Sequence, residues 1–147
     1  MPEYEELNPE FKESLLNWMK TNNQFWTLLG MEIIDLRKGW AKIRLPISEQ
    51  LTNGIGVAHG GAIFSPADSA VGMALVGMLE KDETLSTLEM KINYVKPISN
   101  GDIIAEARIV HRGTMTAVGD VEVRDEKGHL IAKAMATYAI IKKGGRL

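Results

Sequence analysis

The sequence contains no cysteine among its 147 residues. This absence excludes disulfide bonds, thiolate nucleophiles and metal sites with cysteine ligands. The chain also has little net charge, because 17 basic and 19 acidic residues give only −2 at pH 7. Nucleic acids and anionic membranes are bound through basic patches. The charge balance therefore argues against both kinds of partner.

Signals for export and for membrane insertion are also missing. The first segment, MPEYEELNPE, is acidic and lacks a basic region followed by an apolar one, so we expect a cytoplasmic protein. One nearly uncharged run, GVAHGGAIFSPADSAVGMALVGML at residues 56–79, is long enough for a membrane span. Its glycines, its proline and Asp68 favour a helix buried in protein instead. The length suits one domain, residues 1–147, with an N-terminal helix at about 9–20 and a core at about 25–141.

Periodicity in the first half predicts a helix and a hairpin. Asn8 is suited to cap a helix and Pro9 to occupy its first position, and apolar residues then recur at helical spacing up to residue 20. Residues 24–30 are interpreted as a connector. Two strands follow at 31–36 and 41–46, with Gly39 at the turn between them.

The second half reads as a meander of strands at 87–94, 103–110, 115–124 and 130–141. In the first of these, strict alternation predicts that Leu88 and Tyr94 share one face and that Thr87 lies on the other. His111 and His129 fall in the expected turns, where solvated side chains are the simplest interpretation.

Antiparallel strands need one covered face, and only the run at 56–79 is apolar enough to cover it. The pattern therefore predicts an α+β fold, in which a curved antiparallel β-sheet wraps around a long central helix, with an additional helix at the N-terminus.

The central run also carries the candidate chemistry. Gly60 and Gly61 follow His59 at the expected helix N-terminus, where backbone N–H groups point outward and a substrate oxygen can approach closely. This arrangement suits an oxyanion site, although a glycine pair equally suits a loop that leads into a helix. Asp68 is the one charge in the run, and a buried carboxylate costs several kcal/mol unless it is paired. A hydrogen bond to a neighbouring strand or subunit and a catalytic role both account for it.

Several other chemistries lack their motifs. No two histidines have metal-ligand spacing, so we expect no metal site, and no Gly-x-Ser-x-Gly elbow indicates a serine hydrolase. The glycines do not follow a strand in the dinucleotide pattern, and no cofactor is expected.

Three segments carry a family resemblance: NGIGVAHGGAIFSPADSAVGMAL, TLEMKINYVKPISNGD and VEVRDEKGHLIAKAMATYAI. They resemble the hotdog-fold acyl-CoA thioesterases of the phenylacetic-acid-degradation type, within the 4-hydroxybenzoyl-CoA thioesterase superfamily. The likeness runs from about Phe25 to Ile141. It implies a hotdog fold, thioester hydrolysis of an acyl-CoA substrate, and homodimers that pair sheet edges and often form tetramers.

The resemblance also implies roles for individual residues. Gly60 would donate its N–H to the thioester carbonyl, and Asp68 would act as nucleophile or as the base that activates water. His59 and Asn53 would orient the thioester and the water, and Thr87 would place a hydroxyl beside the carboxylate. The further candidates for substrate binding are Gly61, Phe64, Ser65, His111 and Arg112.

Pro66 departs from the family pattern, because relatives usually carry an ordinary helix former there. A proline removes one helical hydrogen bond and crowds the carbonyl of Ala62, which affects how Asp68 is aimed. Spacing adds a separate inference. Gly60 and Asp68 lie about 12 Å apart along one helix, too far to act on the same thioester. Two subunits would then share each site.

Two groups of side chains have both a structural and a functional interpretation. Four aromatic residues suit either an acyl pocket or ordinary packing: Trp18, Phe25, Trp26 and Trp40. Five cations suit either coenzyme A phosphates or plain solvent exposure: Lys91, Lys96, Arg108, His111 and Arg112. A hotdog dehydratase and a non-catalytic acyl-CoA-binding protein are the alternative functions.

Overall fold

The computed structural model describes residues 3–144. Its elements are α1 (Pro9–Asn22), α2 (Gln24–Leu29), β1 (Glu32–Arg37), β2 (Trp40–Pro46), the 3₁₀ helix η1 (Glu49–Leu51), α3 (Gly60–Val76), β3 (Glu83–Tyr94), β4 (Asp102–Arg112), β5 (Thr116–Asp125) and β6 (Leu130–Lys142).

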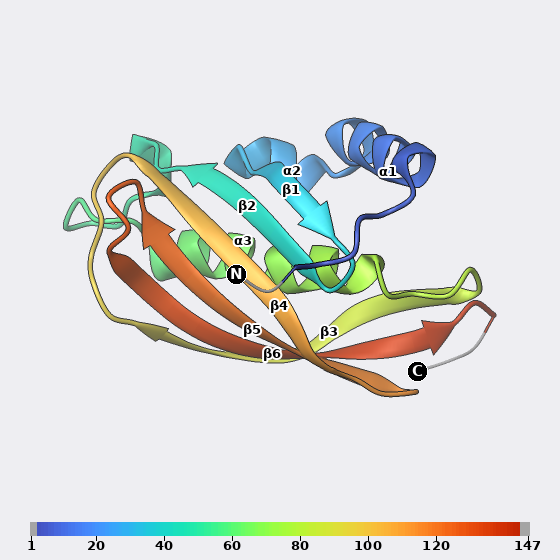
Figure 1. Ribbon diagram of the computed structural model, residues 1–147. Coiled ribbons are helices and arrows are strands. Elements are labelled where there is room, and N and C mark those ends of the chain that lie inside the picture. Colours follow the sequence, from blue (N-terminus) through green and yellow to red (C-terminus); the bar gives the residue numbers. More distant parts are fainter. Residues whose placement is uncertain (1–2, 145–147) are drawn as a thin grey trace.

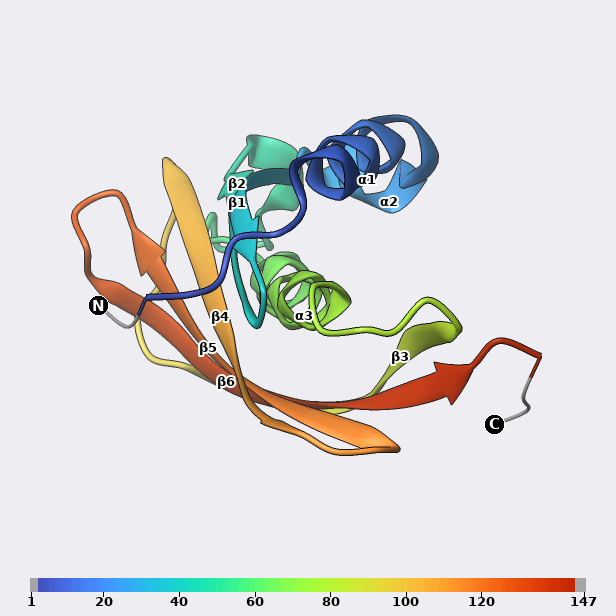
Figure 2. The same ribbon diagram turned by 45° about the vertical axis from the view of Figure 1, so that its right-hand side comes forward.

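One antiparallel six-stranded sheet, in the order β1-β2-β4-β5-β6-β3, curves around α3 (Figure 1). Helices α1 and α2 lie together near β1 and β2 (Figure 2). The expected architecture, a curved sheet wrapped around a long central helix with an extra N-terminal helix, is confirmed. None of the helices within residues 3–144 is long and apolar enough to cross a bilayer.

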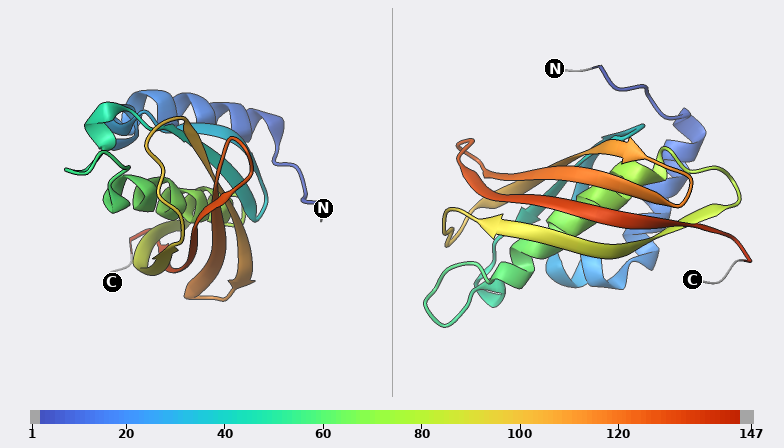
Figure 3. Two further views of the ribbon diagram at one scale, coloured as in Figure 1. Left: turned by 90° about the vertical axis from the view of Figure 1, so that its left-hand side faces the viewer. Right: turned by 90° about the horizontal axis from the view of Figure 1, so that it is seen from below.

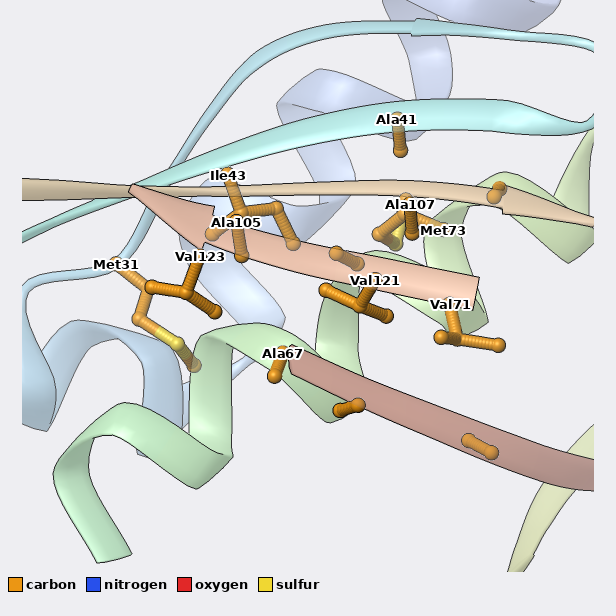
Figure 4. Close-up of a cluster of buried hydrophobic side chains, with 14 of the residues drawn as sticks. Met31, Ala41, Ile43, Ala67, Val71, Met73, Ala105, Ala107, Val121 and Val123 are labelled. Carbon is orange, nitrogen blue, oxygen red and sulfur yellow. The ribbon is translucent and has the colours of Figure 1, made fainter. Parts of the chain in front are cut away.

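The helix packs closely on the sheet because small residues line the contact. Gly119 of β5 leaves room for Val71 of α3, since a Cβ at Gly119 would lie 2.4 Å from Val71 Cγ1. Alanines such as Ala105 and Ala107 of β4 allow the same close approach (Figure 4). The residues of α3 that are buried are Ala62, Ile63, Pro66, Ala67, Ala70, Val71, Gly72, Met73, Ala74 and Leu75.

The predicted four-strand meander is wrong, because β3 does not pair with β4. Strand β3 pairs with β6 at the far edge of the sheet, and β4 pairs with β2 (Figure 3). Segment 95–101, which joins β3 to β4, is longer than a tight hairpin turn and contains Pro97. It crosses the end of the sheet instead of reversing the chain beside β3.

Three local expectations also need correction. Residues 24–29 form helix α2 and not a connector, because Asn23 Oδ1 accepts from Trp26 N and Gly30 takes a left-handed φ of 87° at the C-terminus. His111 lies within β4, which extends to Arg112, and not in a turn. Met115 lies outside β5, which begins at Thr116, and its side chain is exposed.

A β-bulge interrupts the alternation predicted for β3. The pairing of β3 with β6 shifts between Thr87 and Glu89, so Leu88 is an extra residue in the ladder. Thr87 therefore turns toward α3, where its hydroxyl contacts Asp68, and Leu88 is 55% exposed. The prediction that Leu88 and Tyr94 share one face, with Thr87 on the other, is wrong because it assumed unbroken alternation.

Candidate active site

The N-terminus of α3 presents a backbone donor that has no partner in the part of the chain that the structure describes. Gly61 N donates to His59 Nδ1 at 2.9 Å, and the N–H groups of Ala62 and Ile63 donate to the His59 carbonyl oxygen at 2.9 and 3.3 Å. Within residues 3–144, the N–H of Gly60 meets no acceptor. A helix start concentrates partial positive charge, so this N–H is suited to bind a substrate oxygen.

His59 both caps the helix and presents a donor. Because Nδ1 accepts the Gly61 N–H, the proton of the neutral ring is assigned to Nε2. The ring is exposed, and its backbone N is held by the Leu51 carbonyl at 2.8 Å. The Nε2–H therefore faces solvent beside Gly60, where a ligand can accept it.

Asp68 is half-buried on the same helix and is held by two hydroxyl groups. Thr87 Oγ1 lies 3.0 Å from Asp68 Oδ1 and 3.3 Å from Oδ2. The Tyr138 hydroxyl lies 2.7 Å from Oδ1 and 2.7 Å from the Asp68 carbonyl oxygen. Oδ1 is thus the anchored oxygen, and among the residues described Oδ2 has only the longer Thr87 contact.

Sequence reasoning missed Tyr138. Burial raises the pKa of Tyr138 well above its usual value, and the neighbouring Asp68 charge adds to this, so the hydroxyl stays protonated as a donor. The signal was a single tyrosine on a face of β6 that carries three alanines directly before it, at 132, 134 and 136. Gly72 makes space for it, since a Cβ there would lie 3.1 Å from the Tyr138 hydroxyl.

Asn53 shapes the loop that precedes His59. Its Oδ1 accepts from Ile55 N at 3.0 Å and from Val57 N at 3.3 Å, and its own N donates to the Val57 carbonyl. The side-chain oxygen is therefore used within the loop, and the structure does not bring it to Asp68.

The middle of α3 continues unbroken from Gly60 to Asp68. Ser65 Oγ donates to the Gly61 carbonyl at 2.8 Å, which ties this hydroxyl to its own helix. Pro66 is buried, and the helix passes through it without interruption. Phe64 is half-buried and lies one turn from both Gly60 and Asp68.

Arg112 forms its hydrogen bonds far from the N-terminus of α3. Its guanidinium pairs with Glu83, which is 7% exposed, and also donates to the Met78 and Gly113 carbonyls, near the C-terminal end of α3. A hydrogen bond from Glu80 N, together with Arg112, lowers the pKa of Glu83. The structure thus gives Arg112 a partner inside the protein, and it leaves the adjacent His111 exposed on β4.

The aromatic and cationic candidates separate by exposure. Trp26 and Trp40 are buried, with indole N–H groups bonded to Ser69 and Glu106, whereas Trp18 and Phe25 are exposed. The other three cations proposed for coenzyme A phosphates are exposed: Lys91, Lys96 and Arg108.

Comparison with known proteins identifies the class. Residues 55–132 match the sequence profile of the thioesterase superfamily. A protein of Saccharolobus solfataricus is 31% identical over 137 residues, which cover 93% of this chain and 91% of that protein. A 1,4-dihydroxy-2-naphthoyl-CoA hydrolase of Listeria monocytogenes is 30% identical over 78% of this chain and 94% of its own length. The chain belongs to the thioesterase superfamily and is a hydrolase.

Solved structures agree with the hotdog fold expected from the sequence. A conserved protein of Pseudomonas aeruginosa superposes with a TM-score of 0.77 and 35% identity, covering 82% of this chain and 99% of that one. The Escherichia coli PaaI protein from the phenylacetic acid degradation operon superposes with a TM-score of 0.81 over 94% of this chain and 98% of that chain. At 24% identity, the second likeness concerns the fold alone.

Proposed function

We propose that this protein hydrolyses the thioester bond of an acyl-CoA or aryl-CoA, releasing a free acid and coenzyme A. Membership of the thioesterase superfamily and similarity to a hydrolase named for a CoA thioester support this substrate class. The observation that carries the mechanism is a pair of groups on one helix. These are the N–H of Gly60, which meets no acceptor between residues 3 and 144, and the carboxylate of Asp68, which two hydroxyl groups anchor.

Gly60 supplies the oxyanion site in this proposal. The thioester carbonyl oxygen accepts the Gly60 N–H and gains negative charge as the carbonyl carbon is attacked. The helix N-terminus stabilises that charge more in the transition state than in the ground state. The Nε2–H of His59 lies beside this donor and orients the thioester.

Asp68 activates water in this proposal. Because Oδ1 is held by Thr87 and Tyr138, Oδ2 is the oxygen that takes a proton from water as the water oxygen bonds to the carbonyl carbon. The tetrahedral intermediate then collapses, the C–S bond breaks, and the coenzyme A sulfur leaves with the proton that Asp68 returns.

The two groups belong to different subunits in this proposal. Helix α3 is continuous through Pro66, so Gly60 and Asp68 of one chain stay about 12 Å apart. Strand β3, with 12 residues, forms an edge of the sheet and offers unpaired backbone groups to a second copy. Pairing these edges would bring two copies of α3 together, with Gly60 of one facing Asp68 of the other.

The substitution Asp68→Asn tests this function directly, with thiol release measured across a panel of acyl-CoAs. We expect kcat to fall by at least about 100-fold, because the amide cannot accept the proton of water. Coenzyme A binding and the dimer should persist. Asp82→Asn is the matched control, since among the described residues the partner of this exposed carboxylate is Lys142.

Unchanged hydrolysis in Asp68→Asn would contradict the mechanism. If the wild-type protein binds acyl-CoA by calorimetry but releases no thiol from any member of the panel, the proposed function itself is wrong.

A further inference from the structure

Tyr94, at the end of β3, packs against the first residue of α3. Its hydroxyl donates to the Gly60 carbonyl oxygen at 2.8 Å. A Cβ added to Gly60 would lie only 3.2 Å from both Cζ and the hydroxyl oxygen of Tyr94. The ring therefore rests directly on the glycine backbone. Nothing in the sequence motif of α3 indicates this contact, because 34 residues separate the two positions.

This hydrogen bond completes the support of one peptide unit. The Gly60 carbonyl and the Gly61 N–H belong to the same planar group. Tyr94 holds the carbonyl end, and His59 Nδ1 holds the N–H end at 2.9 Å. The Gly60 N–H itself belongs to the preceding peptide unit, whose His59 carbonyl oxygen accepts from Ala62 N and Ile63 N. Because the peptide units on both sides of the Gly60 Cα are then held, rotation about the Gly60 backbone is restricted and the Gly60 N–H keeps its direction. A glycine has no side chain to impose this direction itself.

The bulge at Leu88 is what brings Tyr94 to the helix. Thr87 and Tyr94 are seven positions apart, so strict alternation would place them on opposite faces of β3. The extra residue in the ladder restores both to the side that faces α3. Strand β3 thus contacts α3 at both functional points, through Thr87 at Asp68 and through Tyr94 at Gly60.

We propose that Tyr94 is a positioning residue for the oxyanion site, and that it aims the Gly60 N–H by holding the Gly60 carbonyl. This inference rests on the proposed function. The Tyr94 hydroxyl donates its proton to the Gly60 carbonyl oxygen, so Tyr94 acts on the substrate only through Gly60. Partial burial raises the pKa of Tyr94, which keeps the hydroxyl protonated as a donor.

The substitution Tyr94→Phe tests the proposal, since it removes only the hydroxyl. We expect kcat to fall about tenfold with KM changed less than about twofold, because a misaimed donor weakens transition-state binding specifically. The loss should be the same factor for a short aliphatic and an aromatic acyl-CoA, since the oxyanion is common to both. Tyr4→Phe is the control, because Tyr4 stacks on Trp40 instead of contacting α3.

A double-mutant cycle with Gly60→Ala tests whether Tyr94 acts through Gly60. The methyl group added at Gly60 crowds the Tyr94 ring and so disturbs the same contact. The fold-decrease in kcat of the double variant should therefore be smaller than the product of the fold-decreases of the two single variants. Multiplicative losses would overturn the proposal, as would an unchanged kcat in Tyr94→Phe or a loss that depends on the acyl group.

Backbone amide exchange measured by NMR gives a readout that needs no substrate. In Tyr94→Phe the Gly61 amide should exchange faster, and the Gly60 and Gly61 resonances should shift while those of β5 do not. An unchanged Gly60–Gly61 signal would overturn the proposal even if hydrolysis falls. If the wild-type protein hydrolyses no acyl-CoA but Tyr94→Phe still gives this amide response, the proposed function is wrong and the positioning contact is supported.

Discussion

Asp68 is tolerated within an apolar helix because of its immediate neighbours. An unpaired buried carboxylate is costly by several kcal/mol, but this one is only half-buried and accepts from Thr87 and Tyr138. The next residue, Ser69, is satisfied separately by the Trp26 indole N–H at 3.1 Å. The polar groups at this turn of α3 thus have partners on β3, β6 and α2.

Tyr138 provides a test at the scale of one hydroxyl. Tyr138→Phe removes a donor to Asp68 Oδ1 and keeps the ring that fills the space beside Gly72. We expect kcat to fall about tenfold, because a hydrogen bond to a charged group contributes roughly 1.5–3 kcal/mol and its loss lets the carboxylate rotate. Steady-state kinetics measure the effect.

Urea unfolding separates this effect from loss of the fold. The free energy of unfolding of Tyr138→Phe should fall by about 1.5–3 kcal/mol, which leaves the protein folded at room temperature. An unchanged kcat would show that Thr87 alone holds Asp68 for the reaction.

Helix α3 depends on a glycine in another element. Gly119 of β5 lies against Val71, and both are buried. Protein interiors have little spare volume, so even a methyl group must displace its neighbours. The contact sets how closely α3 approaches the concave side of the sheet.

Gly119→Ala should therefore destabilise the protein. A Cβ at 2.4 Å from Val71 Cγ1 forces helix and strand apart, and we expect a loss of about 1–3 kcal/mol in the free energy of unfolding. Val71→Ala should lower the free energy of unfolding less in the Gly119→Ala variant than in the wild type, because it removes the methyl group that clashes with the new Cβ. Chemical denaturation measures both.

Gly54→Ala is the control for this pair, since a Cβ there meets nothing within 4 Å. Equal stability of Gly119→Ala and the wild type would mean that α3 does not need this close contact.

The whole molecule completes its active site only as a dimer in the proposed function. One chain disabled by His59→Ala and another disabled by Asp68→Asn each lack one half of every site. In a mixed dimer one of the two sites regains both halves. Random exchange should therefore restore about a quarter of the wild-type activity, because half of the dimers are mixed and each has one intact site.

Refolding the two variants together, followed by thiol-release assays, measures this recovery. Each variant refolded alone is the baseline. If the mixture stays at that baseline while exchange of subunits is shown by mass spectrometry, the sites are not shared between subunits.

Much of the fold follows from local sequence. The helix from Pro9, the central helix and most strand positions are encoded by periodicity and caps, which depend on neighbours along the chain. The motif around His59, Gly60 and Asp68 is also local, so the candidate site could be located before the structure was known.

The remaining features depend on contacts between distant segments, so only the tertiary structure decided them. Pairing of β3 with β6 placed β3 at the sheet edge, and the bulge at Leu88 turned Thr87 and Tyr94 toward α3. Tyr138 reached Asp68 across 70 positions. The sequence of a strand shows the alternation of apolar and polar residues. Its register, its place in the strand order and its bulges depend on packing against other elements. The sequence by itself therefore determined which residues form the helix and which of them are candidates for its chemistry. The tertiary structure determined which hydroxyl groups contact those candidates.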